Sequence, residues 1–189
     1  GDVLVVSPDA VLVGISERTT PQAIERLAQR LFAENALKRI VAIRLPDRRA
    51  FMHLDTVLTM VDVNTFLMYA DLPEPECYLV EPGDIDLPLR TTLLGGGLAS
   101  SLAVALGVES VRILSTEQDI FARERDQWHD GCNVLAVAPG VVIGYERNQA
   151  SIADLRAGGI EVIEVPGSEL GRGRGGPRCM SCPIERDRL

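Results

Sequence analysis

Short runs of β-branched and aliphatic residues near the start of the chain alternate with turn residues and one amphipathic stretch. Residues 3–6 and 11–15 are such runs, and the Ser-Pro-Asp-Ala segment between them predicts a hairpin. Thr20 and Pro21 then favour the start of a helix. Its apolar positions follow the spacing of one buried stripe: Ile24, Leu27, Ala28, Leu31 and Phe32. Residues 40–45 return as a strand, so the predicted unit is strand, strand, helix, strand.

The same order of elements recurs later in the chain. Residues 134–147 repeat the pattern of residues 3–18, with a strand, a proline turn, a second strand, a glycine and then Glu-Arg. A short helix at 151–157, stopped by a glycine pair, and an alternating strand at 160–165 complete this copy. Repetition of a supersecondary unit indicates a radial or stacked architecture.

A looser third copy lies between these two. Its predicted elements are strands at 51–59 and 66–69, a helix at 98–106 and a strand at 111–114. Residues 71–90 are expected to form a Pro- and acid-rich loop. Residues 117–131 are expected to be a charged insertion, either a helix or a loop. The sequence therefore predicts one mixed α/β domain over residues 1–189, with modules at about 1–50, 51–116 and 131–189.

The segment richest in candidate chemistry is the loop at residues 171–183, Gly-Arg-Gly-Arg-Gly-Gly-Pro-Arg-Cys-Met-Ser-Cys-Pro. Its glycines let the backbone approach another group closely, and its arginines are expected to stabilise a thiolate. Cys179 is therefore a candidate nucleophile. Its Cys-x-x-Cys spacing with Cys182 also admits a redox pair or half of a zinc site, but Cys77 and Cys132 do not form a second such pair.

Candidate partners for a nucleophile are few, because the chain has only two histidines. Period-2 alternation in the predicted strand at 51–59 places His53 and Asp55 on one face, where the carboxylate favours the imidazolium. The alternatives are a structural histidine or half of a metal site. His129, in the charged insertion, is interpreted as solvated surface. Arg18 and its counterpart Arg147 each suit a substrate carboxylate or a surface ion pair.

Bulk properties exclude several classes of function. The formal charge of −8 argues against nucleic acid or an anionic membrane as the main partner. No apolar run approaches the roughly 20 residues of a membrane span, and no signal-peptide pattern opens the sequence. Four cysteines without a secretory signal indicate free thiols in a reducing cytosol, so a cytoplasmic location is expected.

Several segments together resemble arginine deiminase. They are Met52-His53-Leu54-Asp55-Thr56, the Gly-Asp-Val-Leu opening, Ile15-Ser16-Glu17-Arg18-Thr19 and the loop from residue 171 to the Cys-Pro-Ile-Glu-Arg-Asp segment. The resemblance runs the length of the chain. It implies the fold of the guanidino-group-modifying superfamily, a five-bladed α/β-propeller of strand-strand-helix-strand units, with about three blades present here.

The resemblance also implies a reaction. Cys179 would attack the guanidinium carbon of L-arginine, ammonia would leave, and water would hydrolyse the resulting thiouronium to L-citrulline. His53 would protonate the leaving amine and then activate the water, and Asp55 would hold guanidinium nitrogens. Further substrate contacts would come from Asp2, Arg18 (to the α-carboxylate), Arg174 and Gly176. Neither a metal nor another cofactor is implied.

The resemblance finally implies partners. The family's catalytic glutamate and a further aspartate would lie upstream of Gly1, so an N-terminal part of the same enzyme is an expected partner, as is a second copy in a homo-oligomer. Alone, the chain is expected to be inactive or nearly so. Some relatives carry histidine where this chain has Arg178. Two alternatives stay open: a non-catalytic piece that associates through open sheet edges, and a thiol-redox module.

Overall fold

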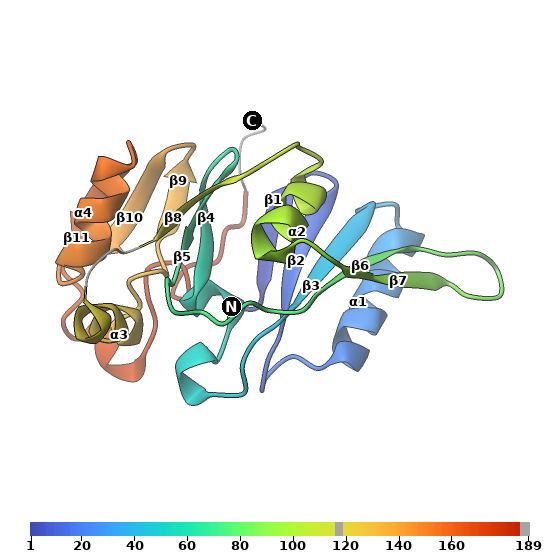
Figure 1. The fold of residues 1–189 in the computed structure, drawn as a ribbon, viewed down its shortest axis with the longest axis horizontal. Coiled ribbons are helices and arrows are strands. Elements are labelled where there is room, and N and C mark those ends of the chain that lie inside the picture. The colour runs from blue at the N-terminus through green and yellow to red at the C-terminus, as the bar shows by residue number, and fades with distance from the viewer. Residues whose placement is uncertain (116–118, 186–189) are drawn as a thin grey trace.

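The computed structural model describes residues 1–115 and 119–185, and its strands form sheets that lie side by side (Figure 1). Three units share the order strand, strand, helix, strand. The first contains β1 (Val3–Ser7), β2 (Ala10–Ile15), α1 (Pro21–Ala33) and β3 (Arg39–Arg44). The second contains β4 (Leu58–Asp62), β5 (Thr65–Met68), α2 (Gly97–Leu106) and β8 (Arg112–Ser115). The third contains β9 (Leu135–Ala138), β10 (Val141–Tyr145), α4 (Gln149–Ala157) and β11 (Glu161–Val165).

Strand pairing is the same in all three units. The first two strands of each unit pair antiparallel, and the second pairs parallel with the strand that follows the helix. A parallel pair needs a long crossover, which the helix supplies. The mixed α/β class expected from the sequence is confirmed, and the order strand, strand, helix, strand occurs at all three expected places.

The strand predicted at 51–59 is wrong over residues 51–57, because β4 begins only at Leu58. Two 3-10 turns, η1 (Arg49–Phe51) and η2 (Leu54–Thr56), occupy most of the segment before β4. The alternation of polar and apolar residues there arises from a turn in which Leu54 is buried and the backbone N–H of Val57 donates to its carbonyl oxygen at 3.1 Å. His53 and Asp55 are therefore not presented side by side on a strand.

The expected loop at 71–90 is also wrong. It contains β6 (Cys77–Pro82) and leads into β7 (Leu89–Leu94), which form an antiparallel hairpin. β6 pairs with β3, so the first sheet has the order β1-β2-β3-β6-β7 and the hairpin projects from one end of the molecule (Figure 1). β7 shows no apolar alternation because it is an exposed edge strand, where polar side chains are tolerated.

The charged insertion contains one helix, α3 (Ile120–Trp128). Asp119 caps it, because its carboxylate accepts from the backbone N–H groups of Phe121 and Ala122 at 3.0 and 3.2 Å. The first residues of the predicted insertion, 117 and 118, lie outside the described part of the chain. None of the helices within the described ranges is long and apolar enough to cross a membrane.

One apolar core joins all the sheets. Leu12 of β2, Phe66 of β5 and Val142 of β10 belong to it, and all three are fully excluded from solvent. A second cluster fills the space between α1 and the opposite face of the first sheet, where Ile24 and Ala28 are buried as predicted. The first sheet is therefore covered on both faces, which gives the functional loops a rigid support.

Candidate active site

The C-terminal loop brings Cys179 against Asp55. The Cys179 Sγ lies 3.4 Å from Asp55 Oδ2 and 3.5 Å from Oδ1, although 124 residues separate the two in the sequence. Asp55 lies in η2 and is fully buried, whereas Cys179 as a residue is exposed. The predicted nucleophile and the predicted guanidinium-binding carboxylate are thus in direct contact.

The Arg178 guanidinium forms an ion pair with the Asp55 carboxylate. Its Nη1 donates to Asp55 Oδ2 at 2.6 Å, and its Nη2 donates to the Val3 carbonyl oxygen at 2.7 Å. The first of these is a charge-assisted hydrogen bond between a guanidinium and a buried carboxylate. Because Arg178 donates to Oδ2, a second guanidinium that enters this site meets a carboxylate already paired with a cation.

The charges around the sulfur disfavour a thiolate in this state. Burial of the thiol and then the negative charge of Asp55 raise the pKa of Cys179 to about 11. A hydrogen bond from Asn133 acts in the opposite direction. The expectation that arginines of the loop stabilise a thiolate is therefore wrong for this structure. Each of these arginines is paired with a carboxylate instead: Arg172 with Glu169, Arg174 with Asp130 and Arg178 with Asp55.

His53 lies at the start of the η2 turn and is half-buried. Its carbonyl oxygen accepts from the backbone N–H of Thr56 at 3.1 Å and from the Thr56 hydroxyl at 2.7 Å, which fixes the turn. Its imidazole packs against Gly1, where a Cβ atom would lie 2.6 Å from the ring Cγ. The backbone N–H of Asp55 donates to the Gly1 carbonyl oxygen at 3.1 Å, so one turn carries both predicted catalytic side chains.

Asp2 is buried and holds two segments together. Its Oδ2 accepts from the hydroxyls of Ser16 and Thr19, both at 2.7 Å, and its Oδ1 accepts from the Leu54 backbone N–H at 2.9 Å. The carboxylate thereby joins the loop after β2 to the η2 turn. The structure thus gives Asp2, expected among the substrate contacts, a role in joining these two segments.

Arg18 lies exposed in the loop after β2. Its backbone N–H donates to Ser16 Oγ at 3.1 Å, and the same hydroxyl donates to Asp2, so the loop conformation is fixed. The Arg18 guanidinium makes no hydrogen bond or ion pair with the residues that the structure describes. It is thus available to an anionic group.

Arg174, expected among the substrate contacts, is anchored by protein groups in this structure. Its guanidinium carbon lies 4.3 Å from the centroid of the Trp128 ring, and Nη2 lies 3.9 Å from Asp130 Oδ1. Its Nη1 and Nη2 also donate to the carbonyl oxygens of Arg49 and Ala50, at 3.3 and 3.4 Å. These contacts fasten the loop to α3 and to η1.

Two adjacent glycines let the loop pack closely on its neighbours. A Cβ atom at Gly176 would lie 2.5 Å from Cβ and Oδ1 of Asn133. The Gly175 backbone N–H donates to Asp130 Oδ2 at 2.9 Å, and its carbonyl oxygen accepts from the Tyr145 hydroxyl at 2.9 Å. Gly176, expected to contact substrate, is required here for close approach to Asn133, a residue that the sequence patterns did not single out.

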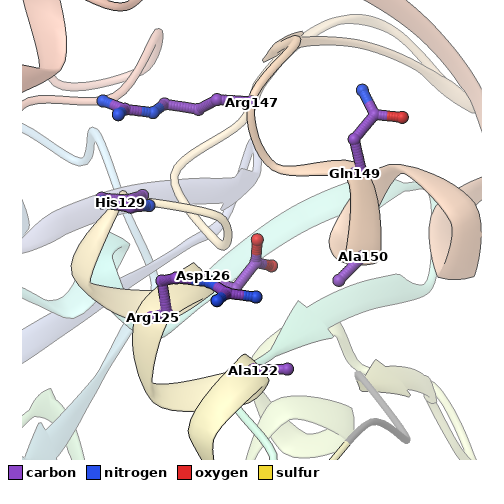
Figure 2. Close-up of a pocket in the computed structure, with 7 residues that line it drawn as sticks. All are labelled: Ala122, Arg125, Asp126, His129, Arg147, Gln149 and Ala150. Carbon is purple, nitrogen blue, oxygen red and sulfur yellow. The ribbon is translucent and has the colours of Figure 1, made fainter.

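A pocket of about 240 Å³ lies apart from this cluster, against α3 and α4 (Figure 2). None of the predicted catalytic residues lines this pocket. Its lining residues are Ala122, Arg125, Asp126, His129, Arg147, Gln149 and Ala150. Figure 2 shows the Arg147 side chain extending over His129 from the loop before α4. His129 is half-buried rather than fully solvated, and its burial lowers its pKa.

The cysteines are free in this structure. Cys77 and Cys132 are buried, as expected for packed residues, whereas Cys179 and Cys182 are exposed. Within residues 1–115 and 119–185, no three or more His, Cys, Asp or Glu side chains are placed to hold a metal ion together. The reactive geometry among these thiols is therefore the contact of Cys179 with Asp55.

The sequence matches the family model described as arginine deiminase over residues 1–186. The chain belongs to the arginine deiminase family. This result agrees with the resemblance found in the sequence.

Solved structures with a similar fold include two amidinotransferases and an arginine dihydrolase. An amidinotransferase from Microseira wollei in the saxitoxin biosynthetic pathway aligns with a TM-score of 0.68 at 18% identity, over 100% of this chain and 47% of that chain. The inosamine-phosphate amidinotransferase from Streptomyces griseus aligns with a TM-score of 0.63 at 14% identity, over 100% and 46%. An arginine dihydrolase from the ornithine–ammonia cycle in cyanobacteria aligns with a TM-score of 0.61 at 18% identity, over 95% and 23%.

At these identities the likeness establishes the fold. The arginine deiminase family chain spans under half of each amidinotransferase and less than a quarter of the dihydrolase. The alignment therefore covers less than two thirds of the length of each of these similar structures.

Proposed function

We propose that Cys179 is the nucleophile of an enzyme that hydrolyses L-arginine to L-citrulline and ammonia. One observation carries the proposal: the sulfur contacts a buried carboxylate that already binds a guanidinium, that of Arg178. A guanidinium held by Asp55 has its electrophilic carbon close to the nucleophile, which is the orientation the reaction needs. The family match over residues 1–186 supports the same reaction.

Substrate binding changes the charge at the sulfur. The guanidinium of L-arginine replaces Arg178 at Asp55, and its positive charge then lies beside Cys179. Because the negative charge of Asp55 is one cause of the raised pKa of Cys179, this added cation favours the thiolate. The nucleophile is thus activated when its substrate is in place.

The thiolate then adds to the guanidinium carbon and forms a C–S bond. Ammonia leaves with a proton supplied by His53, and a thiouronium remains on the sulfur. His53 next removes a proton from water, which adds to the same carbon. The C–S bond breaks, L-citrulline departs, and Cys179 is restored.

Arg18 is the proposed contact for the substrate α-carboxylate. Its guanidinium is exposed and makes no ion pair within the described residues, while its loop is held by Asp2 through Ser16. A planar guanidinium suits a carboxylate because it can donate two parallel hydrogen bonds. This role favours an amino acid substrate over an amine that lacks the carboxylate.

The chain supplies about three units of the proposed five-bladed α/β-propeller. We propose that an N-terminal part of the same enzyme supplies the remaining blades and further acidic residues for the guanidinium, and that the assembled enzyme forms a homo-oligomer. The similar solved chains are at least twice as long as the part aligned here, which supports an enzyme longer than this chain.

The test is citrulline formation from L-arginine, by this chain alone and by the chain combined with the N-terminal part. We expect activity only in the combination, lost on Cys179→Ser and kept on the matched change Cys182→Ser. Absence of citrulline from the combination would refute the hydrolase and favour a non-catalytic piece. Formation of ornithine only when an amine acceptor is added would instead identify an amidinotransferase.

A further inference from the structure

Asn133 lies under the nucleophile in a rigid and fully buried position. Its backbone N–H donates to the Asp130 carbonyl oxygen at 2.9 Å. The carbonyl oxygen of the preceding residue, Cys132, accepts from the Thr59 hydroxyl at 2.7 Å, which ties this segment to β4. The Asn133 side chain therefore has a fixed starting point.

The side-chain amide of Asn133 makes three hydrogen bonds, two of them to Cys179. Its Oδ1 accepts from the Cys179 backbone N–H at 2.9 Å, and its Nδ2 donates to the Cys179 Sγ at 3.1 Å. Nδ2 also donates to the Asp55 carbonyl oxygen at 2.9 Å. One amide group thus connects the nucleophile to the turn that carries the guanidinium-binding carboxylate.

The two backbone partners determine the orientation of this amide. The Asp55 carbonyl oxygen can only accept, and the Cys179 N–H can only donate, so exchanging Oδ1 and Nδ2 would break both bonds. The N–H that faces the sulfur is therefore imposed by groups other than the sulfur. Gly176 permits the arrangement, because any side chain there would collide with Asn133.

We propose that Asn133 is the positioning residue of the nucleophile: it holds the Cys179 backbone through Oδ1 and directs an N–H donor at the sulfur, which favours the thiolate. Only one consequence of this proposal, the effect of Asn133 on the rate of arginine hydrolysis, rests on the proposed function. A thiolate is a stronger hydrogen-bond acceptor than a thiol, so a fixed donor stabilises the charged form. The donor opposes the effect of Asp55, which lies against the same sulfur.

The first test is the rate at which iodoacetamide alkylates Cys179 at pH 8, in a Cys182→Ser background that leaves one exposed thiol. We expect Asn133→Ala to slow alkylation about threefold. A pKa higher by about one unit leaves about tenfold less thiolate, and the greater nucleophilicity of a more basic thiolate restores about threefold. Mere loosening of the loop would act in the opposite direction, because a more exposed thiol reacts faster.

Asn133→Asp separates the two parts of the proposal. An aspartate keeps the acceptor for the Cys179 N–H but replaces the donor by a charged oxygen, so we expect alkylation at least as slow as in Asn133→Ala. Asn148→Ala is the matched control: Asn148 is also buried and donates to the His129 carbonyl oxygen at 3.0 Å, and we expect the wild-type rate. Wild-type or faster alkylation in both Asn133 variants would overturn the proposal.

Two further measurements complete the test. In the assembled enzyme, Asn133→Ala is expected to lower kcat at least tenfold with little change in KM, because Asn133 contacts the nucleophile and not the substrate. If the variants do not fold, the side-chain carbonyl carbon (Cγ) signal of Asn133 in the wild-type NMR spectrum must shift as Cys179 ionises and stop doing so in Cys179→Ala; a signal that does not titrate would refute the proposal. Alkylation and NMR need no turnover, so both still test the role of Asn133 if the proposed hydrolysis fails.

Discussion

At the scale of single residues, Cys179 has two neighbours with opposite effects on the pKa of its thiol. The Asp55 carboxylate lies 3.4 Å from the sulfur and raises its pKa, and the Asn133 amide lies 3.1 Å away and lowers it. The nearby Arg178 is bound to Asp55 instead of to the sulfur. A resting thiol protected from adventitious alkylation is therefore compatible with a reactive thiolate once a guanidinium enters.

Removing the charge of Asp55 tests this balance. In the Cys182→Ser background, Asp55→Asn is expected to speed alkylation of Cys179 at pH 8 by at least threefold, because the pKa of the thiol falls and Arg178 loses its anionic partner. Citrulline formation by the assembled enzyme is expected to be lost, since the carboxylate beside the nucleophile no longer holds the guanidinium. Equal alkylation rates with and without Asp55→Asn in the Cys182→Ser background would contradict the role given to the Asp55 charge.

The sequence predicted part of the residue cluster. Cys179 and Asp55 were both identified, the former from a glycine- and arginine-rich loop and the latter from its place beside a histidine. Asn133 was not, because a single asparagine between Cys132 and Val134 gives no periodic or compositional signal. Its role depends on contacts with residues 46 and 78 positions away, which no local pattern reveals.

At the scale of elements, the loop that carries Cys179 is held from beneath by β10. The hydroxyl of Tyr145, the last residue of that strand, donates to the Gly175 carbonyl oxygen at 2.9 Å and lies 3.3 Å from the Met180 sulfur. Tyr145 is almost completely buried, so the bond has no competition from water. A strand end thus fixes the course of an otherwise irregular segment.

Tyr145→Phe is expected to lower the free energy of unfolding by about 1–2 kcal/mol, because it leaves the buried Gly175 carbonyl oxygen without its donor. Urea denaturation measures the change. The control is Tyr78→Phe, whose hydroxyl donates to the exposed Glu76 at 2.8 Å and should matter by less than about 0.5 kcal/mol. Equal losses in the two variants would argue against a specific role for the Tyr145 hydroxyl.

Element prediction succeeded where one face is buried and failed where it is not. The α1 helix shows the expected cap, with Thr20 Oγ1 accepting from the Ala23 backbone N–H at 3.3 Å, and it buries Ile24 and Ala28 of the expected stripe. β7 was missed because its exposed edge carries no apolar alternation. The turn around Leu54 was taken for a strand because the sequence alternates polar and apolar residues there, although in the turn Leu54, Asp55 and Thr56 are all buried.

At the scale of the whole molecule, one core makes the sheets interdependent. Phe66 on β5 is fully buried and belongs to the same cluster as Leu12 of the first sheet and Leu155 of α4. The active-site residues come from loops attached to different sheets, so their spacing depends on this shared core. The repeated unit was predictable from local patterns, whereas the way the sheets meet was not.

Phe66→Ala is expected to lower the free energy of unfolding by about 3–5 kcal/mol, because it opens a cavity in that core. The matched control is Phe121→Ala on α3, where the side chain is 78% exposed and its loss should change stability by less than about 0.5 kcal/mol. Chemical denaturation followed by circular dichroism compares the two. A small effect at Phe66 would mean that the sheets are not joined through one core.

The contacts that complete the reactive cluster span long stretches of chain. Arg178 meets Asp55 across 123 residues, and Cys179 meets Asn133 across 46. Such contacts carry a larger loop-closure cost than the neighbouring pairings of a helix or hairpin, so we expect them to form late on the route to the native state. During synthesis the nucleophile also leaves the ribosome after nearly all the residues that receive it. A nascent or half-folded molecule therefore lacks its reactive centre, and the thiol chemistry becomes available only when the rest of the architecture is already in place.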